Sequence, residues 1–185
     1  MSETNDSFSD PVIDDVLPTV RPSSSFGHRV VTRFACSALG TMLVRKVGSR
    51  IDPALIRLSG GRLSSVAPFP AMLLTHTGAM SGVTHTSTVV YFSDADRVIV
   101  IAANFGAPRR PAWYYNVKAN PEVTLSGRGF GGSFHAEELV GPERDRLFRL
   151  AADASSPYEH YQRTAGKPTP VIAFHPHSAR GQTGV

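Results

Sequence analysis

From residue 71 onward, short runs of apolar and β-branched residues, separated by turn-forming residues, have the length and composition typical of β-strands. The pattern predicts strands at Ala71–Thr77, Thr84–Phe92, Arg97–Ala103, Glu122–Leu125, Ser133–Val140 and Pro170–Phe174. Because the links between the first three strands are short, we expect these strands to run antiparallel as a meander. A glycine cluster from Gly127 to Gly132 is expected to join the fourth strand to the fifth.

Apolar residues at three- and four-residue spacing predict helices at 28–48, 52–58, 111–117 and 141–154. In the last helix the apolar face consists of Leu147, Leu150, Ala151 and Ala154. The elements do not alternate as βαβ units, which excludes a doubly wound sheet. We therefore expect an α+β fold, namely a small closed or partly open barrel of about six strands with helices packed outside, because closure removes exposed strand edges.

The length of 185 residues suits one domain. Residues 1–25, rich in Ser, Asp and Pro, are expected to be a disordered tail, residues 26–178 a single barrel domain, and residues 179–185 a loose end. The single cysteine, Cys36, excludes an internal disulfide. The acidic start lacks an apolar segment, so it is not a secretory signal, and we expect a cytoplasmic protein.

Charge is distributed unevenly around the net value of +4. The first 25 residues are acidic, so the rest of the chain is strongly basic and would attract an anionic partner such as a phosphorylated cofactor. No nucleic-acid motif accompanies the basic residues, and we expect no nucleic acid. The basic helix predicted at 28–48 packs on its own domain or lies on an anionic membrane surface, so residues 28–50 are a candidate peripheral membrane contact.

The connection between the first two strands is the candidate ligand site. Gly78 and Gly82 bound a turn, and hydroxyl residues follow it at Thr84, Thr86, Ser87 and Thr88. Such a stretch forms a cradle for an anionic or heteroaromatic ligand, or simply a hairpin whose polar side chains face water. His175 and His177 have the spacing of two metal ligands, but no further ligand cluster completes a site, so no metal is expected.

Four stretches together resemble a known family. They are IDPALIRLSGGRL (51–63), LLTHTG (73–78) with SG (81–82), RVIVIAANFGAPRRPAWYYNVKANPEVTL (97–125) and YEHYQ…PVIAFHP (158–176). In these stretches the chain resembles the deazaflavin-dependent nitroreductase family of actinobacteria. The resemblance implies a split β-barrel that binds coenzyme F420 and transfers a hydride from the reduced cofactor to a nitro, quinone or activated-alkene substrate.

The resemblance also implies which residues form the site. The implied cofactor-binding residues are Ser81, Gly82, Val83, His85, Thr86, Ser87, Ala103, Asn104, Trp113 and Asn116. Tyr158 and Tyr161 match substrate-facing aromatics of the family, which pack a flat substrate or deliver a proton, and they are the catalytic candidates. From the residues alone, Trp113 could equally be a core anchor, and the two tyrosines could be the buried face of an amphipathic helix.

The chain departs from the family pattern where cations are usual. Ala79 and Met80 stand in place of a basic pair, His85 in place of an arginine, and Ala103 and Asn104 in place of a serine and a lysine. Backbone amides of Ser81–Val83 could still bind an anion, with Arg109 and Arg110 supplying charge from the next loop. The alternatives are a related enzyme that uses FMN or FAD, and a non-catalytic binder of a cofactor or lipid. We expect a small-molecule substrate and leave a homodimer open.

Overall fold

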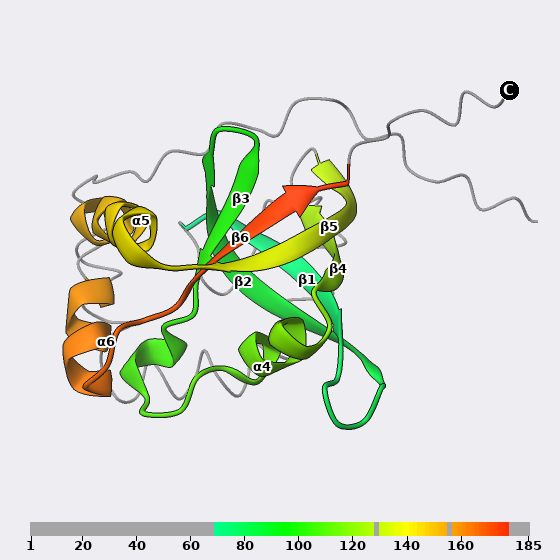
Figure 1. Ribbon diagram of the computed structural model, residues 1–185, viewed down its shortest axis with the longest axis horizontal. Coiled ribbons are helices and arrows are strands. Elements are labelled where there is room, and N and C mark those ends of the chain that lie inside the picture. The colour runs from blue at the N-terminus through cyan, green and yellow to red at the C-terminus, as the bar shows by residue number, and fades with distance from the viewer. Residues whose placement is uncertain (1–68, 128–129, 155–156, 178–185) are drawn as a thin grey trace, which may run out of the picture.

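Six strands close into a barrel in the order β1-β2-β3-β6-β5-β4 (Figure 1). The computed structural model describes residues 69–127, 130–154 and 157–177. The strands are β1 (Ala71–Thr77), β2 (Thr84–Asp94), β3 (Arg97–Ile101), β4 (Glu122–Gly127), β5 (Phe130–Leu139) and β6 (Val171–Pro176). Every neighbouring pair is antiparallel, including the closing pair of β1 with β4. The predicted α+β barrel is confirmed.

Seven strand ends differ from the prediction: the last residues of β2, β3 and β4, and both ends of β5 and β6. β2 continues to Asp94 because Ala95 adopts a left-handed φ of 55° and lets the chain reverse at once. β3 ends at Ile101, two residues early, because the chain turns into the short helix η2 (Asn104–Gly106). The glycine cluster is not simply a loop, since Gly131 pairs with Ser126 inside the β4–β5 ladder. The hydrophobic pattern could not locate this pairing, because glycine has no side chain to assign to a face.

The barrel interior forms one apolar cluster, and the helix α4 (Ala112–Ala119) closes one end of it. Alternate residues of each strand point inward, as Met72 and Leu74 do in β1 and Val89 and Tyr91 do in β2. Other inward residues pack with these, and α4 adds its two buried side chains, Trp113 and Val117. The helix begins after Pro111, whose fixed φ suits a helix start, and ends before Pro121, as the sequence predicts.

A second apolar cluster covers the outside of β3 and β6 beneath α5 (Gly141–Ala154) and α6 (Pro157–Ala165). From α5 it buries Leu147 and Ala151, as predicted. Leu150 was placed on the same face, but its exposure of 40% shows that this prediction is wrong. Phe148 takes the buried position instead, and the Arg144 guanidinium lies 4.5 Å from the centre of its ring. The spacing of apolar residues could not show which of the neighbouring residues Phe148 and Leu150 faces the barrel.

Several predictions lie outside the described residues: the helices at 28–48 and 52–58, the tails at 1–25 and 179–185, Cys36, and the membrane contact at 28–50. Among the helices of the described ranges, none has the length and apolar character needed to cross a membrane.

Candidate functional site

The turn between β1 and β2 is closed by its own backbone. The Gly78 amide donates to the Val83 carbonyl at 2.8 Å, and the Gly82 amide donates to the Gly78 carbonyl at 2.9 Å. The Val83 amide donates to the Ser81 hydroxyl at 3.3 Å. Gly82 has a φ of +66°, a conformation that favours glycine. Two of the three amides predicted to bind an anion are thus occupied within the turn.

Within the described part of the chain, the amides of Met80 and Ser81 have no acceptor. These two consecutive donors lie at the exposed tip of the turn, where successive backbone amides can form a concave anion site. Among the turn amides of the described residues, those of Met80 and Ser81 are therefore the donors left for a ligand.

Residues of β2 that were predicted to bind one cofactor point to opposite faces of the strand. Ser87 shares the inward parity of Val89, and its hydroxyl lies 3.0 Å from His76 Nε2. Thr86 has the outward parity, and its hydroxyl lies 3.4 Å from that of Thr75. His85 follows the inward parity but is exposed near the end of the strand. Ser87 and Thr86 therefore do not face the same side of the sheet.

Asn116 links helix α4 to the turn, and Asn120, the residue after the helix, links it to the end of β1. The Asn116 side-chain oxygen accepts the Ala79 amide at 3.0 Å, and its Nδ2 lies 3.1 Å from His76 Nδ1. Asn120 Nδ2 donates to the Thr77 carbonyl at 3.4 Å. On the same helix Lys118 forms a 2.7 Å ion pair with Glu138 of β5. The predicted site residue Asn116 thus lies at the turn, and its amide is used within the protein.

His76 is a functional candidate that the sequence did not single out. Its side chain is buried at 4% exposure, and burial together with the neighbouring His85 lowers its pKa from 6.5 to about 4. The two imidazole rings lie 5.9 Å apart. A signal was present in the sequence, because His76 has the same parity along the strand as the apolar residues Met72 and Leu74.

The loop after β3 holds an unusual backbone. Asn104 and Phe105 have φ values of 45° and 54°, and Gly106 follows at 77°. Two non-glycine residues in the left-handed region carry a conformational cost, and such strain concentrates at functional sites. The Asn104 side chain supports the loop by donating to the Arg109 carbonyl at 2.7 Å. Ala103, the other predicted site residue here, is buried in the outer cluster and has only a methyl group to offer.

The two candidate tyrosines lie on α6 against this loop. Tyr161 is buried and meets the ring of Phe105 edge-on at 6.1 Å. Tyr158 meets Tyr161 at 6.4 Å in the same manner, and burial raises the pKa of its phenol to about 12. Among the described residues the Tyr158 hydroxyl has no hydrogen-bond partner. Tyr158 thus remains a protonated donor at neutral pH, while Tyr161 also serves as a packing residue.

The remaining predicted residues are Trp113, Arg109 and Arg110, and within the described part of the chain none of them forms a hydrogen bond with the β1–β2 turn. Trp113 is buried in the interior cluster, so its core-anchor role is visible in the structure. Arg110 Nη2 donates to the Pro168 carbonyl, away from the turn, and its Nη1 is buried without a partner among the described residues. Arg109 is exposed. Neither arginine bonds to the turn residues.

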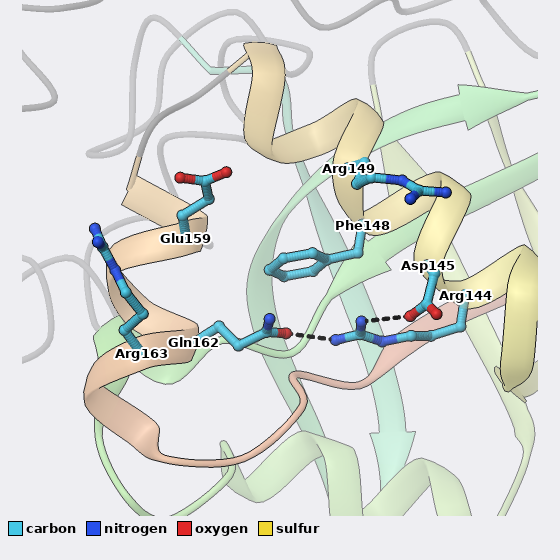
Figure 2. A pocket seen from close by; sticks show the side chains of 7 residues that line it. All are labelled: Arg144, Asp145, Phe148, Arg149, Glu159, Gln162 and Arg163. Carbon is cyan, nitrogen blue, oxygen red and sulfur yellow. Dashed lines mark hydrogen bonds and ion pairs between the residues drawn. The ribbon is translucent and has the colours of Figure 1, made fainter.

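A separate charged pocket of about 380 Å³ lies between α5 and α6 (Figure 2). Figure 2 shows Phe148 at its centre and the Arg144–Gln162 hydrogen bond, 2.6 Å long, along its base. Arg144 also donates to the Thr169 carbonyl and to Asp145. These acceptors occupy every nitrogen of the guanidinium. Through them Arg144 joins α5 to α6 and to Thr169, just before β6. Tyr158 and Tyr161 are not among the lining residues.

Most of the candidate residues lie at one end of the barrel. Figure 1 shows the β1–β2 turn, α4 and the loop after β3 along the lower edge, with α6 beside that loop. One part offers backbone amides and polar groups for an anion, and the other offers buried aromatic rings and a phenol.

Comparisons with known proteins cover the same elements. The sequence profile described as F420H(2)-dependent quinone reductase matches residues 48–176. An F420H(2)-dependent quinone reductase of Mycobacterium tuberculosis is 31% identical over 130 residues, which are 68% of this chain and 87% of the relative.

Among solved structures, an F420-H2 dependent reductase (FDR-A) has a TM-score of 0.53 and 34% identity over 57% of this chain and 94% of that one. A structure described as a domain-swapped dimer has a TM-score of 0.54 and 30% identity over 73% of this chain and 98% of that one.

Proposed function

Because the chain belongs to the family of F420H2-dependent quinone reductases, we propose that it reduces a quinone with the hydride of reduced coenzyme F420. The resemblance to a deazaflavin-dependent family is confirmed, and with it the class of F420-dependent oxidoreductase. The observation that carries the proposal is the extent of the family match, since residues 48–176 include every candidate element from β1 to α6.

The β1–β2 turn is the proposed binding site for the anionic tail of the cofactor. Its support is the pair of amides at Met80 and Ser81, together with the exposed imidazole of His85 beside them. Anions bind where backbone donors converge, and they favour the protonated form of a nearby histidine. Asn116 supports this site by fixing Ala79 to α4.

The loop after β3 and α6 are the proposed site for the flat rings. When bound, the reduced deazaflavin supplies a hydride, and the substrate also takes up a proton to become the hydroquinone. Tyr158 is the proposed donor to the quinone oxygen as negative charge develops there, because its phenol packs beside Tyr161 and is protonated at neutral pH. Tyr161 holds the Phe105 ring and keeps this end of the site apolar and dry.

Binding and turnover test the proposal. We expect titration with F420H2 to change the fluorescence of Trp113 in the purified protein until the change saturates. We also expect the protein to oxidise F420H2 when menadione is added. FMN and FAD serve as competing ligands, and a nitroaromatic and an activated alkene serve as competing substrates. Binding of FMN or FAD without binding of F420H2 would contradict the cofactor assignment. If Tyr158→Phe combined with Tyr161→Phe leaves menadione turnover unchanged, the substrate-side assignment is wrong.

The proposal includes a small-molecule substrate and a homodimer. The support for a dimer is the 30% identical structure that is a domain-swapped dimer. Light scattering of the full chain tests it, and a monomer mass at micromolar concentration would exclude it.

A further inference from the structure

We propose that His76 is a positioning residue: as a neutral Nε2–H tautomer, it holds Asn116 so that Asn116 fixes the backbone of the β1–β2 turn at Ala79. The inference rests on the proposed function only in its last step, the effect on cofactor binding. Its first steps concern this chain's own hydrogen bonds.

The orientation of Asn116 follows from its contact with the backbone. The Ala79 amide can only donate, so the Asn116 atom 3.0 Å away must be the carbonyl oxygen. Asn116 Nδ2 therefore points to His76 and can only donate there. The acceptor at 3.1 Å is His76 Nδ1, which must be without a proton.

The opposite side of the ring completes the tautomer. With Nδ1 unprotonated, a neutral imidazole carries its proton on Nε2, and this N–H donates to the Ser87 hydroxyl at 3.0 Å. The ring thus connects β2 to α4, while α4 connects to the turn. Protonation of Nδ1 would bring two donors face to face and break the link to Asn116.

The surroundings favour the neutral ring. His85 is the titratable group that faces His76 from β2, and a positive charge there disfavours a second one. From α4 the ring meets the neutral Asn116, and no carboxylate of the described residues forms an ion pair with it. Burial at 4% exposure acts in the same direction.

Two substitutions of His76 test the hydrogen bonds of Nδ1 and Nε2 one at a time. In His76→Asn the side-chain oxygen can occupy the position of Nδ1 and accept from Asn116, while the donor to Ser87 is lost. In His76→Gln the longer side chain can place its amide near Nε2 and donate to Ser87, while the acceptor for Asn116 is lost. The variants have similar size loss and polarity, so each serves as the control for the other.

Three measurements on the full chain test the positioning role. Nitrogen-15 shifts of His76 should show Nε2 protonated and Nδ1 unprotonated at pH 7. Exchange of the Ala79 amide should be at least tenfold faster in His76→Gln than in His76→Asn, whose rate stays near that of the native protein. The affinity for F420H2 should fall at least fivefold in His76→Gln and less than twofold in His76→Asn.

The outcomes distinguish this inference from the proposed function. A protonated Nδ1, or equal Ala79 exchange in the two variants, overturns the positioning role whatever the cofactor does. Absence of F420H2 binding to the native protein overturns the proposed function and leaves the exchange result to decide the role of His76. If Ala79 exchange is at least tenfold faster in His76→Gln than in His76→Asn but the two variants bind F420H2 equally well, the positioning role stands and the turn does not hold the cofactor.

Discussion

Replacing Met80 with lysine should strengthen binding of F420H2. Met80 lies at the tip of the β1–β2 turn with an exposure of 101%, so its side chain packs against nothing that the substitution would lose. The backbone amides of Met80 and Ser81 are unaffected by a change of side chain. The family resemblance implies a basic pair at positions 79 and 80, so Met80→Lys would supply one of the two cations beside the proposed anion site.

The size of the gain follows from Coulomb's law at an exposed position. Two unit charges about 4 Å apart attract by about 1 kcal/mol in water and by about 4 kcal/mol at an effective dielectric constant near 20. Ordering a lysine side chain offsets part of this, and exposed ion pairs are worth about 0.2–1 kcal/mol when measured. We therefore expect a net gain of about 1 kcal/mol, or roughly a fivefold lower Kd.

The assay is F420H2 titration at two ionic strengths. The gain should be largest at low salt and shrink near 0.5 M salt, where screening acts over roughly 4–5 Å. Val140→Lys is the matched control: it adds the same charge at an exposed residue, 78% accessible, in the link between β5 and α5. Equal gains in both variants would mean that only net charge matters. No gain in Met80→Lys would refute the placement of an anion at the turn.

Three further predictions concern single residues. Gly106→Ala should lower the free energy of unfolding by about 1–3 kcal/mol in urea titration. The reason is that φ is +77° and a Cβ would lie 3.2 Å from the Tyr161 backbone. The control Gly131→Ala, whose Cβ would meet its nearest atom at 3.5 Å, should change the free energy of unfolding little. The unfolding free energy should fall as pH rises from 10 toward about 12, because unfolded tyrosine ionises first while the raised pKa keeps Tyr158 protonated; the slope from this group, about 1.4 kcal/mol per pH unit, should vanish in Tyr158→Phe. The unfolding free energy should also fall as pH drops from 6.5 toward about 4, because unfolded His76 takes up a proton that the native ring, with its lowered pKa, does not; a slope identical in His76→Asn would contradict this.

The fold was largely predictable from the chain because its strands follow a simple rule. A run of apolar and β-branched residues bounded by turn residues predicts a strand, and the run at Ala71–Thr77 locates both ends of β1. Glycine-rich Phe130–Gly132 contains no such run, and the start of β5 was consequently missed. Leu150 failed for a related reason, since spacing on a helix identifies an apolar stripe without fixing its edges.

The site was less predictable because its key contacts join segments that are distant in sequence. The Asn116–Ala79 bond spans 37 residues, and the His76–Asn116 bond spans 40. Family resemblance indicated Asn116 but could not show that its amide is already bonded within the protein. The left-handed pair Asn104–Phe105 was also invisible, because neither residue type requires such a backbone.

The lack of cationic side chains at Ala79 and Met80 and the proposed neutral His76 have a common consequence for how this turn would bind an anion. With Ala79 and Met80 in the turn, backbone amides and the exposed His85 are what the described residues offer there. Amide dipoles at contact distance depend less on salt than mobile surface charges do, since screening acts over about 8 Å at physiological ionic strength. Such donors hold an anion only where they are fixed in direction, and the link from His76 through Asn116 to Ala79 fixes the chain beside them. The native affinity for F420H2 should therefore vary little with salt and depend strongly on the geometry of the turn, whereas Met80→Lys should make it salt-sensitive. A native affinity that falls more than tenfold between 50 mM and 500 mM salt would show that cationic side chains, not the fixed backbone, hold the cofactor.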